Sequence, residues 1–267
     1  MKLVFDIGAT HTRLALTDGK TLQDIQRFDT DVTGKGIDAL LGHMDRYLDG
    51  HTITAAIGGM PGQLDRATGR LVHSTNTPGW TGKRVGREIA QHLGVPLTVR
   101  NDVEMVGLGE ALYGAGQGNR IVVYLTVSTG VNGARIVDGV LEDSSEGFEL
   151  GAQLVEGQDH KPHSLEGLTG GAALSRTYHK APRDITDARV WRQEAQYLAL
   201  GLYNTILHWS PDVVVMGGSM MRDIDVSEVA TFLRRLPRVY DSWPPIVRAR
   251  LVDDGGLYGA MALSNRA

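Results

Sequence analysis

The stretch Leu3-Val4-Phe5-Asp6-Ile7-Gly8-Ala9-Thr10 decides the fold, because a short apolar strand in it runs into a turn that contains glycine and threonine. A returning strand is expected from Thr12 to Thr17, where alternating and apolar residues follow the turn. Asp18-Gly19 then closes the segment. The chain therefore opens on a β-hairpin whose turn presents backbone amides and a hydroxyl.

The same layout returns about 120 residues later. Ile121–Val127 is a β-branched strand, residues 128–133 form a turn with serine, threonine and glycine, and Ala134–Val137 is the return strand before Asp138-Gly139. One such hairpin is weak evidence, since any β protein can contain one. Two of matching layout predict a duplicated domain in which both turns serve one ligand; two coincidental hairpins are the alternative.

Helical and strand patterns alternate along the rest of the chain, which indicates an α/β protein. The predicted helices are residues 37–48, 85–93, 103–113, 190–209 and 226–236, with a short last helix opened by Gly255-Gly256, and a further helix that contains residue 166 near its start. The remaining predicted strands are residues 53–57, 96–99, 213–216 and 244–251, with a hairpin over 64–72.

Composition excludes several classes of function. Glycine is abundant, with 34 of 267 residues, as expected for many tight turns and phosphate-facing loops. The net charge of −4 does not favour nucleic-acid binding, and the chain has no dense basic segment that would bind an anionic membrane. The absence of cysteine excludes disulfides and thiolate metal sites. No signal peptide or membrane span is apparent, so a cytoplasmic location is expected.

The two turns carry the groups that phosphoryl transfer requires: donors for phosphate oxygens, a carboxylate for the metal, and a base near the acceptor hydroxyl. The first turn offers the amides and hydroxyl of Gly8 and Thr10, and the second offers Thr129 and Gly130. Asp6, at the end of the first strand, is expected to hold Mg²⁺ through water. After the strand at 213–216, the bare backbone of Gly217 and Gly218 can approach an adenine or ribose.

Taken in order, several short motifs resemble the ROK family (repressors, open reading frames, kinases) of the actin-like ATPase superfamily. They are Asp6-Ile7-Gly8-Ala9-Thr10, Pro61-Gly62, Asn76-Thr77-Pro78-Gly79-Trp80, Asn101-Asp102, Ser128-Thr129-Gly130, Pro211-Asp212-Val213-Val214-Val215-Met216-Gly217-Gly218 and Gly259-Ala260. Each motif is weak alone, but the ordered set is specific and extends over nearly the whole chain.

The resemblance implies two duplicated ribonuclease-H-like lobes, residues 1–115 and 116–254, with a C-terminal helix at about 255–267 that packs back on the first lobe. It implies Mg²⁺·ATP in an interlobe cleft and a small-molecule sugar as the partner, with a homodimer among the expectations. Asp102 stands where these kinases keep the general base. The expected sugar contacts are Pro61, Gly62, Asn76, Asn101, Asp102, Glu149 and Glu166. The expected nucleotide contacts are Asp6, Gly8, Thr10, Thr12, Thr129, Gly130, Gly217 and Gly218.

The chain departs from the family pattern in one segment. Gly147-Phe148-Glu149-Leu150-Gly151 resembles the family's Gly-Glu-Ile-Gly-His, but Ala152 replaces the histidine, which in relatives helps to bind the sugar and often a zinc ion. The cysteine cluster that normally follows is absent. His160 and His163 lack a third ligand, so a solvated loop is favoured over a metal site. We therefore expect no zinc site, and an unusual acceptor or reduced activity.

Alternatives stay open at this point. Asn101 and Glu104 have the spacing of a helix capping box, which is compatible with catalysis but does not require it. The leading prediction is an ATP-dependent kinase for a hexose or hexosamine. A non-catalytic sugar- or nucleotide-sensing protein and a nucleotide hydrolase are the competing functions, and the sequence does not identify the sugar.

Overall fold

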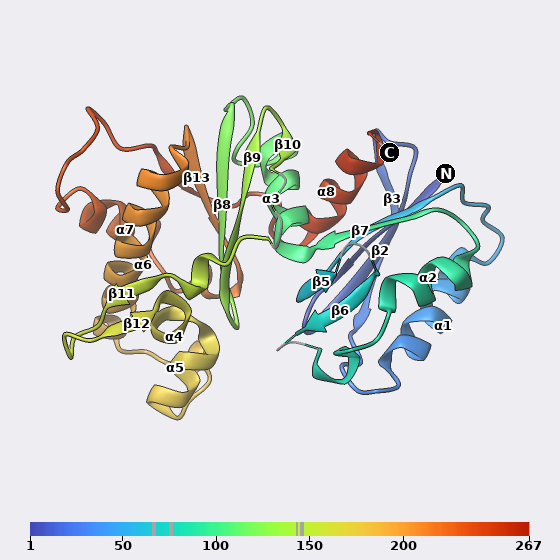
Figure 1. The fold of residues 1–267 in the computed structure, drawn as a ribbon, viewed down its shortest axis with the longest axis horizontal. Coiled ribbons are helices and arrows are strands. Elements are labelled where there is room, and N and C mark those ends of the chain that lie inside the picture. Colours follow the sequence, from blue (N-terminus) through green and yellow to red (C-terminus); the bar gives the residue numbers. More distant parts are fainter. Residues whose placement is uncertain (66–67, 75–76, 143, 145–146, 267) are drawn as a thin grey trace. The chain divides into compact units, whose positions relative to one another are not determined.

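The computed structural model describes residues 1–65, 68–74, 77–142, 144 and 147–266, and divides into two compact units. Unit 1 comprises Met1–Gly109 together with Asp253–Ala267, and unit 2 comprises Glu110–Val252. Figure 1 shows the strands and helices of both. Within the described residues, no helix is both long enough and apolar enough to span a membrane.

Unit 1 is built on a mixed five-stranded sheet in the order β3-β2-β1-β4-β7. Its strands are β1 (Lys2–Ile7), β2 (His11–Thr17), β3 (Leu22–Asp29), β4 (Ala56–Met60) and β7 (Leu97–Asn101). β2 is antiparallel to β1 and β3, whereas β1, β4 and β7 run parallel. The carboxyl ends of the three parallel strands therefore lie at one edge of this sheet.

One face of this sheet forms the core of unit 1 with α1 (Gly36–Leu48) and α2 (Val85–Leu93). Alternate β1 residues, Leu3, Phe5 and Ile7, point to this face because side chains along a strand alternate. A small hairpin of β5 (Gln63–Asp65) and β6 (Arg70–His73) and a short turn of helix at Pro78–Trp80 complete the face.

The opposite face carries α8 (Gly255–Ser264), which packs on β1 and β4, and α3 (Asp102–Tyr113), which follows β7. In Figure 1 the red helix α8 lies beside strands coloured blue, although α8 is at the other end of the chain from them. Helices α3 and α8 approach each other through glycines: a Cβ on Gly109 would lie 2.2 Å from the Gly255 oxygen, and one on Gly259 would lie 1.8 Å from the Met105 oxygen. Larger side chains would force these helices apart.

Unit 2 repeats the sheet of unit 1 strand for strand. Its order is β10-β9-β8-β13-β14, with β9 antiparallel to β8 and β10, and with β8, β13 and β14 parallel. The strands are β8 (Ile121–Val127), β9 (Val131–Val137), β10 (Val140–Leu141), β13 (Val213–Gly217) and β14 (Ile246–Arg248). The predicted duplicated α/β fold is confirmed, because coincidental hairpins would not reproduce five strands in the same order and direction.

The core of unit 2 lies between this sheet and α6 (Ala188–Trp209), whose buried face includes Leu198, Leu202 and Ile206. Helix α6 also packs against α4 (Leu165–Thr169) and α7 (Val226–Leu233). The remaining elements are α5 (Gly171–Tyr178), the hairpin of β11 (Leu154–Glu156) and β12 (Pro162–Ser164), and 3-10 turns at Leu150–Ala152, Pro182–Asp184, Ser219–Arg222 and Val252–Asp254.

Glycines inside strands explain two wrong boundaries. The strand predicted over residues 53–57 is β4, which starts later and includes Gly58 and Gly59. A Cβ on Gly58 would lie 2.2 Å from the Phe5 ring, so glycine here permits core packing and does not end the strand. Likewise β9 begins at Val131 and includes Gly133, where a Cβ would lie 2.6 Å from the Tyr124 oxygen.

Two predicted elements are shorter than expected, and β3 was not predicted. The strand at 244–251 is reduced to β14, because the amides of Arg250 and Leu251 donate to Glu110 Oε1, at 2.8 and 2.6 Å, in place of a neighbouring strand. Helix α7 ends at Leu233, a few residues before Pro237. Most of β3 is exposed, so it lacks the apolar pattern by which strands are recognised.

Candidate functional site

Asp6 and Asp102 come to the same edge of the unit 1 sheet. In the parallel register, Asp6 of β1 pairs with Gly59 of β4, and Gly59 pairs with Arg100 of β7. Asp102 begins α3 directly after β7, and a Cβ on Gly59 would lie 3.1 Å from the Asp102 Cα. The missing side chain at Gly59 therefore makes room for the start of α3. Ligand sites in open α/β sheets form at this carboxyl edge.

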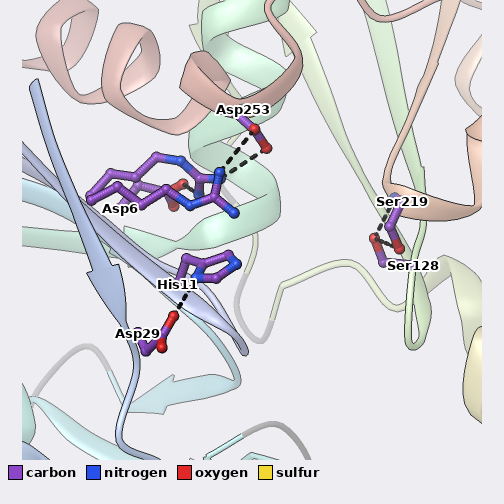
Figure 2. A network of polar contacts seen from close by, with 8 residues as sticks. Asp6, His11, Asp29, Ser128, Ser219 and Asp253 are labelled. Carbon is purple, nitrogen blue, oxygen red and sulfur yellow. Dashed lines mark hydrogen bonds and ion pairs between the residues drawn. The ribbon is translucent and has the colours of Figure 1, made fainter.

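Asp6 is a buried carboxylate with 6% of its surface exposed. Its Oδ2 lies 3.6 Å from Arg13 Nη1, and Arg13 Nη2 lies 2.9 Å from Asp253 Oδ1 (Figure 2). A Cβ on Gly256 would lie 2.4 Å from the carboxyl carbon of Asp6, so only glycine at the start of α8 leaves room for this carboxylate. Burial and, to a smaller extent, the charge of Asp102 raise the pKa of Asp6 to about 7, although the charge of Arg13 acts to lower it.

Asp102 is half-buried, and its Oδ1 accepts a hydrogen bond from the Val103 amide at 3.0 Å. Burial raises the pKa of Asp102 to about 6, although that hydrogen bond lowers it. A carboxylate of this basicity is suited to accept a proton near neutral pH. The perturbed pair Asp6 and Asp102 at one strand edge is therefore the strongest candidate for chemistry in unit 1.

Asn101 supports both its own helix and the neighbouring loop. Its Oδ1 accepts from the Val103 amide at 2.9 Å, which is the capping role considered from the sequence, and its Nδ2 donates to the Gly62 oxygen at 3.2 Å. Gly62 has φ of +97°, in the left-handed region that favours glycine, and follows Pro61 after β4. Asn76, the remaining expected sugar contact in this unit, lies outside the described residues.

The predicted nucleotide residues in and after the β1–β2 turn differ in their exposure to solvent. Gly8 donates its amide to the His11 oxygen at 2.9 Å, and Thr10 is exposed at the tip. Thr12, by contrast, is 1% exposed, and its hydroxyl lies 2.9 Å from that of Thr30. The Thr12 hydroxyl is thus engaged within unit 1, and its nucleotide contact stays a prediction. His11, the first residue of β2, has its Nδ1 3.0 Å from Oδ1 of Asp29, its neighbour on β3 (Figure 2).

The predicted nucleotide residues of unit 2 come together at the ends of β8 and β13. Ser128 Oγ accepts from the Ser219 amide at 3.0 Å, which connects the turn of Thr129 and Gly130 to the residues directly after Gly218 (Figure 2). Gly218 has φ of +99°, and a Cβ on Gly217 would lie 2.4 Å from the Tyr124 hydroxyl. Packing within unit 2 is thus sufficient to require these glycines, and their nucleotide role stays a prediction.

Glu149 and Glu166 lie near the same turn. Glu149 is exposed and precedes the 3-10 turn Leu150–Ala152, while Glu166 in the first turn of α4 accepts from the Val131 amide at 2.8 Å through Oε2. A Cβ on Gly151 would lie 2.0 Å from the Val131 oxygen and 3.1 Å from Glu166 Cβ. The segment after Glu149 is therefore packed against both the turn and Glu166.

The β11–β12 hairpin holds the two histidines considered as metal ligands. His160 Nδ1 lies 2.7 Å from Glu156 Oε1, and His163 Nε2 lies 2.8 Å from Asp159 Oδ1. Both contacts are exposed pairs of one histidine with one carboxylate. Over the described ranges, no group of three or more histidine, cysteine, aspartate or glutamate side chains is placed to hold a metal ion.

Sequence reasoning missed several contributors to this site. Arg13 contacts Asp6, and Asp253, which lies 240 residues later, contacts both Arg13 and Arg27. Ser219 was also missed, although it follows the Gly217-Gly218 pair directly. Arg13, three residues after Thr10 of the first turn, could have been noticed in the sequence, but its partner is set by tertiary structure.

A family model described as the ROK family matches residues 3–267. The chain belongs to the ROK family. The resemblance stated from the motifs is thereby confirmed over nearly the full length.

Individual relatives agree with this assignment. A fructokinase from Zymomonas mobilis is 26% identical, with 96% of this chain and 94% of the relative aligned. The crystal structure of a ROK hexokinase from Thermus thermophilus is similar with a TM-score of 0.84 and 28% identity, covering 99% of this chain and 98% of that one. A ROK glucokinase from Streptomyces griseus, solved with glucose and AMPPNP, shares the fold at a TM-score of 0.81 and 20% identity, covering 100% and 99%. This ROK chain thus has sugar kinases as its relatives and the actin-like ATPase fold.

Proposed function

We propose that this ROK protein transfers the γ-phosphoryl group of ATP to a hydroxyl of a hexose or hexosamine, with Asp102 as the general base. The observation that carries the proposal is the pair of carboxylates, buried Asp6 and half-buried Asp102, at the carboxyl edge of β1 and β7. The ROK kinases that it resembles act on glucose, fructose or hexoses according to their names. Their variety supports sugar phosphorylation and leaves the sugar to experiment.

In this proposal Asp102 takes the proton of the attacking sugar hydroxyl. Its raised pKa makes the carboxylate a better proton acceptor than an exposed aspartate, and its backbone hydrogen bond to Val103 fixes the side chain. Asn101 and the Pro61-Gly62 loop, joined by the Asn101–Gly62 hydrogen bond, are assigned to sugar hydroxyls in unit 1. Asn76, Glu149 and Glu166 are assigned to the same substrate on the family resemblance.

Asp6 fits a magnesium role because Mg²⁺ prefers carboxylate oxygens and needs only one or two of them, the rest of its shell being water. Arg13 contacts Asp6 and Asp253, and Arg27 also contacts Asp253, so with Asp102 at the same strand edge the three carboxylates outnumber the two arginines. A divalent cation would balance the negative charge that remains. Bound there, the cation would neutralise phosphate charge as it develops during transfer. Gly8 and Thr10 in unit 1, and Thr129, Gly130, Gly217 and Gly218 in unit 2, are assigned to the nucleotide.

A coupled assay for ADP with a panel of sugars tests the proposal. Wild-type protein with Mg²⁺ and ATP should release ADP in response to at least one of glucose, fructose, mannose or an N-acetylated hexosamine. Asp102→Asn should reduce that rate by roughly 10²–10⁴-fold, while Asp45→Asn, the same substitution on exposed α1, should not change it. Equal loss in both variants, or an Asp102→Asn variant with full activity, would contradict Asp102 as the base.

Ala152 is the specific observation that favours a second candidate, a non-catalytic protein that senses a sugar or nucleotide. It stands, exposed, after the Glu149 segment where the ROK pattern has a sugar-binding histidine. Calorimetry separates the two functions: sugar or nucleotide binding without sugar-stimulated ADP release supports the sensor, whereas binding with release supports the kinase. Release of ADP that no sugar stimulates would indicate a nucleotide hydrolase instead.

A further inference from the structure

The turn between β8 and β9 is held by the start of α5. The Ser128 oxygen accepts from the Gly171 amide at 2.8 Å, and the Thr129 oxygen accepts from the Ala172 amide at 3.0 Å. The Ser128 amide in turn donates to the Gly130 oxygen at 2.8 Å. All three carbonyl groups of this turn are therefore engaged within unit 2, two of them by α5.

Unlike its carbonyl groups, two amides of the same turn have no partner among the described residues. Within the described part of the chain, the amides of Thr129 and Gly130 donate to no protein acceptor, and Thr129 is exposed. Two consecutive turn amides without a protein acceptor are available as donors to an anion. This gives a structural basis for the phosphate contact assigned to Thr129 and Gly130, provided that the turn keeps its conformation.

Glu166 holds the turn from its other end. Its Oε2 accepts from the Val131 amide at 2.8 Å, and Val131, the first residue of β9, is 3% exposed. The carboxylate fits there because residue 130 is glycine: a Cβ on Gly130 would lie 2.3 Å from Oε2. A Cβ on Gly170 would lie 3.2 Å from Glu166 Cγ, so a second glycine accommodates the stem of the side chain.

The backbone of Glu166 is fixed as well. The preceding Ser164 caps α4 by accepting from the Gly167 amide at 3.0 Å, and the Glu166 oxygen accepts from the Gly170 amide at 2.8 Å. The carboxylate is thus delivered to the turn by a short, capped helix. Because Val131 is buried, its amide would have no acceptor if Glu166 were truncated, and a buried amide without one is costly.

We propose that Glu166 is a positioning residue for the nucleotide: by holding the Val131 amide it keeps the Thr129 and Gly130 amides aimed at a phosphate. This role rests on the proposed kinase function and adds to the sugar contact expected for Glu166 from the ROK resemblance. It acts through the turn and does not require the carboxylate to touch the nucleotide. Nucleotide affinity should therefore depend on Glu166 even when no sugar is present.

Calorimetric binding of Mg²⁺·AMPPNP without sugar tests this role. Glu166→Ala should weaken binding by about tenfold or more, because the turn loses a charge-assisted hydrogen bond. Glu166→Gln should bind within about threefold of wild type or more tightly, because its side-chain oxygen still accepts from Val131 and its negative charge is gone. Glu156→Ala, on the exposed hairpin, is the matched control and should bind as wild type does.

A second variant approaches the contact from the turn. Gly130→Ala would displace the Glu166 carboxylate and should weaken AMPPNP binding as Glu166→Ala does, so the test survives if one variant fails to fold. Circular dichroism at the binding temperature identifies the folded variants. Wild-type affinity in Glu166→Ala, or equal losses in Glu166→Ala and Glu166→Gln, overturns the positioning role alone. Absence of AMPPNP binding by the wild-type protein overturns the proposed kinase function together with it.

Discussion

Replacing Glu194 by glutamine should remove most of the pH dependence of stability that unit 2 has between mildly acidic and mildly alkaline solution. Glu194 lies on the buried side of α6 with 3% of its surface exposed, and its Oε2 has no hydrogen-bond partner among the described residues. Burial raises the pKa of this carboxyl from its ordinary value of 4.5 to about 8. The native protein therefore holds a proton on Glu194 at neutral pH that the unfolded chain has released.

The difference in the pKa of Glu194 between native and unfolded protein sets the direction and size of the change in stability with pH. Because the native state binds the extra proton, the contribution of Glu194 is fully present below pH 4.5 and is lost as the pH rises through about 8. At about 1.36 kcal/mol for each pKa unit, the free energy of unfolding should fall by roughly 5 kcal/mol over this range. Glutamine has the same shape and no proton to release, so the Glu194→Gln variant should lack this decline.

Urea unfolding at pH 5, 7 and 9, followed by tryptophan fluorescence, reports mainly on unit 2, because three of the four tryptophans, Trp191, Trp209 and Trp243, belong to it. The stability of Glu194→Gln relative to wild type should increase from pH 5 to pH 9. Glu228→Gln, on the partly exposed side of α7, is the control and should follow the wild-type curve. If wild type and Glu194→Gln lose stability in parallel, the buried acid is not neutral and the reasoning fails.

Three further predictions concern Asp102, Gly58 and the Glu110 carboxylate. Since burial raises the pKa of Asp102 to about 6, kcat/KM for the sugar should fall about tenfold per pH unit below pH 6; a profile that stays flat to pH 4.5 would contradict a basic Asp102. Gly58→Ala should lower the free energy of unfolding by about 1–3 kcal/mol, because its Cβ would meet Phe5. Gly34→Ala, whose Cβ would meet no atom within 4 Å, should change thermal unfolding little. Glu110→Ala leaves three amides without their acceptor and should cost about 3 kcal/mol or more in urea unfolding; a loss below about 1 kcal/mol would show that water replaces the carboxylate.

The α/β class and most elements could be predicted from the sequence, because local patterns decide them. Helix α2 and strand β8 have the bounds expected from their apolar residues. The predicted strands left out Gly58 and Gly133, but both lie inside strands because Phe5 and Tyr124 approach them closely. Nothing in the neighbouring sequence distinguishes such a glycine from one in a turn. Strand β3 was not predicted because an exposed edge strand carries no apolar pattern.

The part of the candidate site that lies at the ends of strands could be predicted from the sequence. Parallel register brings Asp6 and Asp102 to one edge, so two motifs 96 residues apart in sequence could be placed together from topology alone. The environment that tunes these carboxylates could not be predicted, since Arg13 and Asp253 meet only in the folded chain. The burial of the Thr12 hydroxyl against Thr30 could not be predicted either, because it depends on the pairing of β2 with β3.

The discontinuity of unit 1 has a consequence for how the molecule is made. The strands β1, β2 and β4 leave the ribosome early, but α8, which covers one face of them, follows only after the whole of unit 2 has been synthesised. Unit 2 is continuous and has all its strands available as soon as Val252 has emerged. During translation the earlier sheet therefore waits with its Val4 and Ile57 face without α8, which makes nascent chains stalled before residue 253 prone to aggregate or to recruit a chaperone.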